Sequence, residues 1–123
     1  RWFETREEIA RVLHPALADS PGHDNWRHLC GTSDLAAGLF SVVFDERFSS
    51  DQVDRFCDGL RLFRLGYSWG GPISLVVPYD IASMRHCRYT QLQAGTVVRF
   101  SVGLEQVDDL RADLAQALAK AFG

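Results

Sequence analysis

Two segments of the chain place apolar residues at three- and four-residue spacing, which is typical of amphipathic helices. The first helix is expected to begin after Ser49, because Ser49 and Gln52 fit the capping box. Its apolar stripe consists of Val53, Phe56, Cys57, Leu60 and Phe63. We expect it to run for about four turns and to end at Gly66, since glycine tolerates the positive φ of a helix terminus. The second helix is predicted over 107–122, with Lys120 in its last turn, as the helix dipole favours.

The N-terminal part of the chain carries weaker signals. Apolar residues at Trp2, Phe3, Ile9 and Ala10 predict a helix from Arg1 to about Arg11, followed by a short extended strand from Val12 to Pro15, because a residue before proline disfavours the helix. Asp24 is a candidate N-cap for a short helix that reaches Cys30.

Runs of β-branched and aromatic residues predict the strands. The run 38–44 is almost continuously apolar, so both of its faces are expected to be covered. Further strands are predicted over 73–77, where Pro78 is expected to end the strand, and over 97–102; the segment 80–88 reads as a short helix or loop. The order of elements predicts an α+β two-layer sandwich, with a mostly antiparallel sheet of about four to five strands and helices on one face.

Composition narrows the class of protein. A chain of 123 residues fits one domain, 1–123, and can bury about two-thirds of its unfolded surface. A net charge of −3 argues against nucleic-acid and acidic-membrane partners. No apolar run is long enough for a transmembrane helix, and no signal peptide is recognised. The start at Arg1-Trp2-Phe3, without methionine, is consistent with a fragment or a processed product, and this apolar start predicts surface that needs a partner.

Cysteine and histidine spacing offers no metal or redox motif. Cys30, Cys57 and Cys87 are odd in number and form no C-x-x-C pair, which predicts reduced thiols in a cytoplasmic protein. His23 and His28 could contribute to a metal site, but they are more simply read as residues of a surface segment. No G-x-S-x-G motif supports hydrolase chemistry.

The candidate chemistry lies in a glycine-rich turn and in a strand with an arginine at its centre. The turn, within 65–75, carries Tyr67, Ser68 and Trp69. In the strand, alternation places Arg99 on the face opposite Phe100. A planar guanidinium suits a carboxylate, which it can bind through two parallel hydrogen bonds. The alternative is an arginine on a solvent-facing strand that pairs with a surface acid.

These segments carry a resemblance to a known family. Five segments resemble the C-terminal domain of the pyridoxal-phosphate (PLP) enzymes of cysteine and methionine metabolism. They are LGYSWGG, SLVVP, VVRFSVGLEQVDDLRADLAQAL, RVLHPAL and SPGHDNWRHLCGTSDLAAGLFSVVF. The resemblance covers nearly the whole chain, and within the family it is greatest to the cystathionine β-lyases. It implies an intact carbon–sulfur lyase that converts cystathionine to homocysteine, pyruvate and ammonia. A γ-synthase or γ-lyase domain, and a free-standing module that binds amino acids or a protein, stay open as alternatives.

The resemblance also implies roles for single residues. Arg99 would bind the α-carboxylate of the substrate, Ser68 and Trp69 would line the same pocket, and Tyr67 would lie nearby. Trp69 could instead be a core aromatic residue, and Tyr67 could pack on the sheet edge. Glu105 reads as an end-of-strand or pre-helix residue rather than an acid catalyst.

The cofactor is expected outside this chain. The family needs a lysine for its PLP aldimine, and the sequence contains one lysine, Lys120, which reads as a solvated residue at the end of a helix. The resemblance therefore implies no catalytic or PLP-binding residue here, and a fragment that is inactive alone. It implies an absent N-terminal PLP-binding domain and neighbouring subunits, in a homotetramer, as partners besides the amino-acid substrate.

Overall fold

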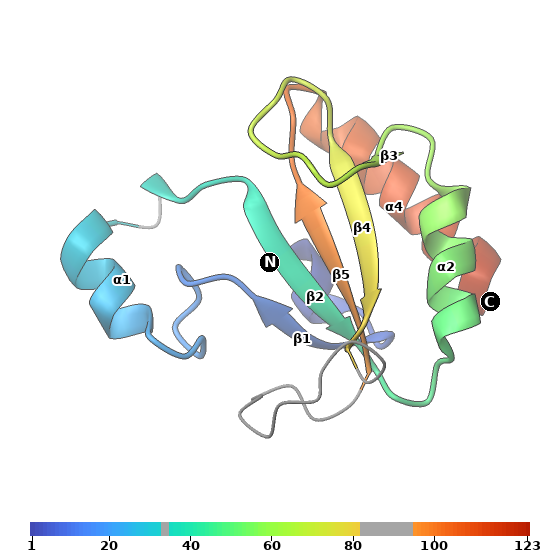
Figure 1. Ribbon diagram of the computed structural model, residues 1–123, viewed down its shortest axis with the longest axis horizontal. Coiled ribbons are helices and arrows are strands. Elements are labelled where there is room, and N and C mark those ends of the chain that lie inside the picture. The colour runs from blue at the N-terminus through green and yellow to red at the C-terminus, as the bar shows by residue number, and fades with distance from the viewer. Residues whose placement is uncertain (33–34, 82–94) are drawn as a thin grey trace.

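The computed structural model describes residues 1–32, 35–81 and 95–123, and in these ranges a sheet of five strands forms the centre of the molecule (Figure 1). The strands are β1 (Ile9–Leu13), β2 (Leu39–Phe44), β3 (Arg64–Leu65), β4 (Leu75–Asp80) and β5 (Thr96–Ser101). They lie in the order β1-β2-β5-β4-β3. Every neighbouring pair is antiparallel except β3 and β4, which are parallel. The predicted α+β fold with a mostly antiparallel sheet is confirmed.

Two helices cover one face of the sheet. Helices α2 (Ser50–Gly59) and α4 (Val107–Phe122) pack against each other on that face (Figure 1). The short helix α1 (His23–Cys30) differs from this arrangement, because it buries no residue and stands at the side of the sheet. The prediction of helices on one face is therefore right for α2 and α4 but does not extend to α1.

The hydrophobic core lies between the sheet and these two helices. Phe100 of β5 is fully buried at its centre, and its ring lies 5.1–5.3 Å from the rings of Phe3, Phe40 and Phe63. The same cluster contains Val42, Phe44, Val53, Phe56, Cys57, Val76, Val98, Leu110, Leu114, Ala117 and Leu118. Val98 and Phe100 belong to this cluster and Arg99 does not, as the predicted alternation along β5 requires.

The predicted helix over residues 1–11 is wrong. The chain forms a single 3₁₀ turn, η1 (Trp2–Thr5), and then enters β1 at Ile9. β1 pairs with β2, for example through Val12 and Val42, and this pairing outweighs the weak helical spacing. Phe3 is only 4% exposed, so it belongs to the core rather than to a surface that needs a partner. The strand predicted from Val12 to Pro15 corresponds to the last part of β1, which ends at Leu13.

Helix α2 begins as predicted but ends early. Ser49 and Gln52 form the capping box, with the Gln52 N–H donating to Ser49 Oγ at 3.3 Å and the Ser49 N–H donating to Gln52 Oε1 at 3.1 Å. The helix ends at Gly59, not Gly66, because Leu60 is already extended (φ −71°, ψ 142°). A Cβ atom at Gly59 would lie 3.6 Å from Ala117 Cβ, so this glycine lies close to α4 rather than to the sheet.

Two further boundaries differ from expectation. Helix α1 is preceded by Gly22 in the left-handed region (φ 80°), and Asp24 lies in its first turn instead of capping it. Pro78 lies inside β4, where it is paired with Val98, rather than ending the strand. β3 pairs only with Leu75 and Val76, so proline's missing N–H costs no bond to β3. Most of the segment predicted over 80–88, with Cys87, lies outside the described residues.

A buried carboxylate accounts for the early end of α2. Asp113 of α4 is 5% exposed and accepts hydrogen bonds from the main-chain N–H groups of Arg61 (2.9 and 3.1 Å) and Leu62 (2.8 Å). In the next turn of α4, Gln116 Nε2 donates to the Gly59 carbonyl at 2.8 Å. The chain leaving α2 is thus held by α4, an arrangement that no local pattern encodes.

We expect Asp113→Ala to lower the free energy of unfolding by about 1–3 kcal/mol, the cost of leaving buried N–H groups without an acceptor. Urea unfolding of the chain measures this loss. Asp54→Ala is the matched control, because Asp54 lies on the exposed face of α2 and its replacement should change stability by less than about 0.5 kcal/mol. Equal losses in the two variants would contradict a structural role for Asp113.

Candidate functional site

The glycine-rich loop between β3 and β4 is held along one side of β5. Arg99 and Ser101 occupy alternate positions of β5, so their side chains face the same side of the sheet, and Gly103 follows just after the strand ends. Ser101 Oγ accepts a hydrogen bond from the Gly70 N–H at 3.2 Å, and the Gly103 N–H donates to Ser74 Oγ at 2.9 Å. Arg99 makes the remaining contacts with this loop. Contacts from the segment 99–103 therefore hold the loop at its start, middle and end.

Arg99 reaches main-chain oxygens of the loop rather than an acid. Its Nη2 donates to the carbonyl oxygens of Gly66 (3.2 Å), Tyr67 (2.7 Å) and Ser68 (3.2 Å). Its Nε is buried and has no hydrogen-bond partner among the described residues. Among the residues that the structure describes, no carboxylate lies within ion-pair distance of this guanidinium. The predicted alternative, an arginine paired with a surface acid, is not what this part of the chain forms.

This arrangement creates a positively charged site with an unused donor. Carbonyl dipoles orient the guanidinium but leave its net charge uncompensated. A buried donor without an acceptor is costly, by about 1–3 kcal/mol, and a guanidinium edge matches the two oxygens of a carboxylate. The geometry is therefore suited to binding a small anion that carries a carboxylate.

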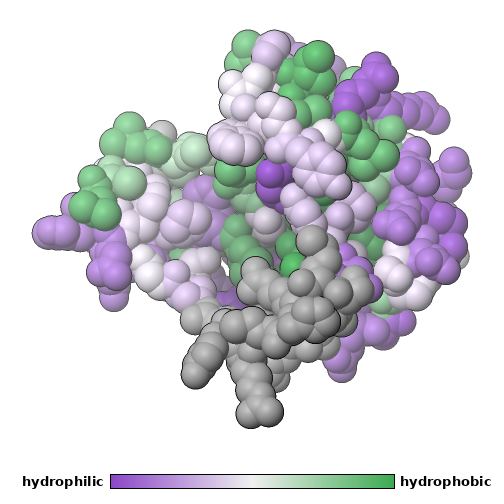
Figure 2. Space-filling view, viewed as in Figure 1, coloured by the Kyte–Doolittle hydropathy of each residue, from purple (hydrophilic) through white to green (hydrophobic). Residues whose placement is uncertain are grey.

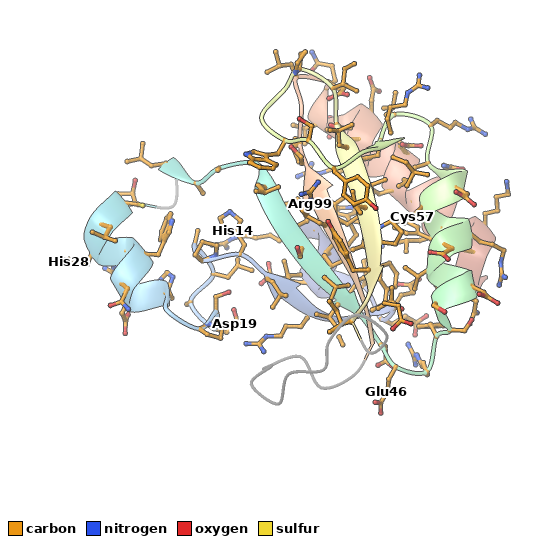
Figure 3. All side chains as sticks on the ribbon, viewed as in Figure 1. His14, Asp19, His28, Glu46, Cys57 and Arg99 are labelled. Atoms are coloured by element: carbon orange, nitrogen blue, oxygen red, sulfur yellow. The ribbon has the colours of Figure 1, made fainter. Side chains whose placement is uncertain are left out.

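The other predicted site residues surround Arg99, but not all through their side chains. Tyr67 and Ser68 contribute their carbonyl oxygens, while their side chains are exposed. Tyr67 is 75% exposed and Trp69 is 64% exposed, so neither packs in the core or on the sheet edge. The ring centroid of Trp69 lies 6.0 Å from Arg99 Cζ, at the outer limit of a cation–π contact. In Figure 3, Arg99 lies over the middle of the sheet, below this loop, and in Figure 2 the surface in this region is mostly of intermediate hydropathy.

Sequence reasoning missed the pair formed by Ser74 and Glu105. Ser74 is fully buried; its N–H donates to Glu105 Oε1 at 2.8 Å and its hydroxyl donates to Glu105 Oε2 at 2.8 Å. Burial raises the pKa of the Glu105 carboxyl, but hydrogen bonds from Ser74 and from its own main chain outweigh that effect and hold the pKa below its ordinary value of 4.5. The carboxylate therefore stabilises the fold above its unfolded-state pKa, and this contribution is lost as the pH falls through the lowered pKa. The sequence offered one signal for this pair: Ser74 is a lone polar residue at the start of an apolar strand.

Gly103 is required by the close approach of the loop. A Cβ atom there would overlap the Pro72 carbonyl oxygen and would lie 2.7 Å from both the Ile73 carbonyl carbon and Glu105 Oε2. The first two are main-chain atoms, which cannot rotate away. The main chain of the loop must therefore move if any side chain is introduced at this position.

We expect Gly103→Ala to destabilise the protein by about 1–3 kcal/mol, as overpacking does, and to lower activity because the loop that holds Arg99 is displaced. Melting temperature and kcat/KM of the full-length protein measure the two effects. Gly71→Ala is the control, since a Cβ atom at Gly71 meets nothing within 4 Å. A Gly103→Ala variant as stable and active as Gly71→Ala would show that the loop does not need this contact.

Other reactive groups do not assemble into a site in the described ranges. Cys30 and Cys57 are free thiols, and burial, with smaller contributions from Asp54 and Asp58, raises the pKa of Cys57 to about 12, so this thiol stays protonated. His23 Nδ1 lies 2.8 Å from the Pro15 carbonyl oxygen. Within residues 1–32, 35–81 and 95–123, no cluster of metal-ligating side chains occurs, and no helix is long and apolar enough to cross a membrane.

Comparison with known proteins places the chain in a family. It is 41% identical over 123 residues to a cystathionine beta-lyase of Salmonella typhimurium, with 97% of this chain and 30% of that protein aligned. It is 35% identical over 120 residues to an L-alanine/L-glutamate racemase of Wolbachia pipientis, with 98% of this chain and 29% of that protein aligned. Among solved structures it matches the crystal structure of metB from Corynebacterium glutamicum with a TM-score of 0.74 and 32% identity, over 97% of this chain and 30% of that one.

The chain thus spans about a third of the length of these relatives. The family model for Cys/Met metabolism PLP-dependent enzymes matches residues 1–119, which is nearly the whole chain. The mostly antiparallel sheet, the loop 66–74 and the arginine strand all lie within the matched range. The chain therefore belongs to the Cys/Met metabolism PLP-dependent enzymes.

Proposed function

We propose that this chain is the substrate-carboxylate-binding domain of a carbon–sulfur lyase, and that the intact enzyme cleaves cystathionine to homocysteine, pyruvate and ammonia. The observation that carries the proposal is Arg99, whose Nε is buried without a partner and whose charge meets no carboxylate among the described residues. The similarity to a cystathionine beta-lyase, at 41% identity, supports the choice of substrate class.

In this proposal each residue of the site has a separate task. Arg99 binds the α-carboxylate of the amino acid, and the carbonyl groups of residues 66–68 hold the guanidinium in one orientation. The exposed ring of Trp69 lies beside the guanidinium and contacts the bound amino acid. Fixing the carboxylate fixes the direction of the bond to be broken, and such positioning accelerates a reaction without any group that transfers a proton.

The residues of this chain do not fit the cofactor itself. PLP would supply an electron sink for the cleavage and needs a lysine to hold it. Lys120, the single lysine of the sequence, is exposed at the last turn of α4. We propose that the PLP site lies in another part of the full-length protein, and that this chain binds substrate together with that part and with neighbouring subunits in a cytoplasmic homotetramer.

Product analysis with the full-length protein tests the proposal. Incubation with cystathionine should release homocysteine, pyruvate and ammonia in equal amounts. Cysteine and a four-carbon oxoacid would instead indicate γ-elimination. The similarity to an alanine/glutamate racemase favours one further outcome, exchange of the α-proton of alanine or glutamate without elimination. Either of these as the main activity would overturn the β-lyase proposal while leaving the carboxylate-binding role of Arg99 intact.

A further inference from the structure

Ser74 is the point at which both ends of the glycine-rich loop are joined. Its carbonyl oxygen accepts a hydrogen bond from the Arg64 N–H at 2.9 Å, which ties it to the strand that enters the loop. Its hydroxyl accepts from the Gly103 N–H at 2.9 Å, and its N–H and hydroxyl both donate to Glu105. The Leu104 N–H donates to the Pro72 carbonyl at 2.9 Å in the same region. Glu105 is therefore the one carboxylate among the groups that fix the exit of the loop in the described structure, and it accepts two of these hydrogen bonds.

Both oxygens of Glu105 are engaged by Ser74, at 2.8 Å each. A carboxylate held in this way is a poor candidate for proton transfer to a substrate, because its oxygens already accept strong hydrogen bonds from donors that do not move away. No hydrogen bond or ion pair joins Glu105 to Arg99, although both belong to the chain segment that runs along the loop. The hydrogen bonds that connect Glu105 to Arg99 run through the loop.

We propose that Glu105 is a positioning residue for Arg99: it fixes the exit of the loop at Ser74, so that the carbonyl groups of residues 66–68 hold the guanidinium in its binding orientation. This inference rests on the proposed role of Arg99 as the carboxylate anchor. The chain of contacts is continuous, from Glu105 to Ser74, from Ser74 to Arg64 at the loop entrance, and from the carbonyl groups that follow to Arg99 Nη2.

A double-mutant cycle in the full-length enzyme tests the inference. Glu105→Gln keeps the shape of the side chain but removes its negative charge and replaces one acceptor oxygen by an NH₂ group, so that only one of the two hydrogen bonds that Ser74 donates to Glu105 keeps its acceptor. We expect kcat/KM for the amino-acid substrate to fall about tenfold in the wild-type background. In the Arg99→Ala background the same change should lower kcat/KM less than about twofold, because two residues that act as a unit are not additive. The melting temperature should fall in both backgrounds.

The cycle separates positioning from a general effect on stability. An equal loss of kcat/KM in the two backgrounds, or a lower melting temperature with unchanged kcat/KM, would overturn the inference while leaving Arg99 as the anchor. Unchanged kcat/KM in Arg99→Ala alone would overturn the proposed function, and the inference with it.

Two further variants complete the design. Glu46→Gln is the matched control, because Glu46 is exposed in the turn before α2 (Figure 3) and should leave kcat/KM and melting temperature unchanged. Ser74→Ala removes the hydroxyl but keeps the N–H bond to Glu105, so it provides the same cycle if Glu105→Gln does not fold. A smaller loss of kcat/KM for Ser74→Ala in the Arg99→Ala background than in the wild type again supports the inference. Equal losses in the two backgrounds contradict it.

Discussion

Arg99→Ala in the full-length protein is expected to lower kcat/KM for the amino-acid substrate about ten- to a thousandfold. Hydrogen bonds to charged groups contribute about 1.5–3 kcal/mol each, and each 1.36 kcal/mol is about tenfold in rate. The buried Nε has no acceptor among the described residues, so the hydrogen bonds to the loop leave part of the guanidinium's donor capacity unused. The loss should therefore be large even though Nη2 is already bound to the loop.

Arginine removal also frees the loop, and a lysine variant separates the two effects. In Arg99→Lys the ammonium can still donate to the carbonyl groups of residues 66–68, but it cannot present a planar pair of donors to a carboxylate. We expect Arg99→Lys to keep a melting temperature near that of the wild type and to recover only part of the lost kcat/KM. Full recovery by lysine would mean that substrate binding depends on the positive charge and not on the planar pair of donors.

Inhibitor binding provides a second, independent readout. An amino-acid inhibitor should bind Arg99→Ala more weakly than the wild type by a factor similar to the loss in kcat/KM. An amine analogue that lacks the α-carboxylate should bind both proteins equally. If both compounds lose affinity equally, or if only the melting temperature changes, the arginine serves the structure of the loop and not the substrate.

The site could be predicted in part because its essential contact depends on residue type. The arginine inside an apolar strand left a carboxylate site and a surface ion pair both open, and the resemblance of the tyrosine-serine-tryptophan-glycine-glycine turn to the PLP-enzyme family favoured the carboxylate site. The way in which Tyr67 and Ser68 contribute was not predictable, because they use carbonyl oxygens that every residue carries. Glu105 reads in the sequence as an ordinary end-of-strand residue, since its partner Ser74 lies 31 residues earlier in the chain and only the folded sheet brings them together.

The predictions of the fold also succeeded where the cause is local in the sequence and failed where it is distant. The capping box at Ser49, the strand 39–44 and helix α4 are local signals, and they are confirmed. The end of α2 was missed because the apolar stripe continues to Phe63, which stays in the core after the helix has ended. The acceptor for Arg61 and Leu62 comes from Asp113, about 50 residues away in the sequence. The N-terminal strand was missed for a similar reason, because residues 9–13 are extended through their pairing with β2, which lies far along the chain.

Phe100→Ala is expected to cause a large loss of stability, about 3–5 kcal/mol, the usual range for removing a buried aromatic ring. Phe100 is 0% exposed, and its ring contacts those of Phe3, Phe40, Phe56 and Phe63, which come from the N-terminal turn, a neighbouring strand, α2 and the chain after α2. Removing it leaves a cavity that these rings, held by separate elements, can fill only in part.

Urea unfolding of the chain measures this loss, and Phe48→Ala serves as the aromatic control. Phe48 is only half-buried, and its aromatic contact is with Phe122 near the end of α4, so its replacement should cost less than half as much. Phe100→Leu should recover most of the stability, because a branched apolar side chain refills much of the cavity. Since Phe100 and Arg99 are adjacent on opposite faces of β5, Phe100→Leu should also preserve substrate binding. A loss below about 1 kcal/mol for Phe100→Ala, far under the cost of a buried ring, would show that this face of β5 does not carry the core.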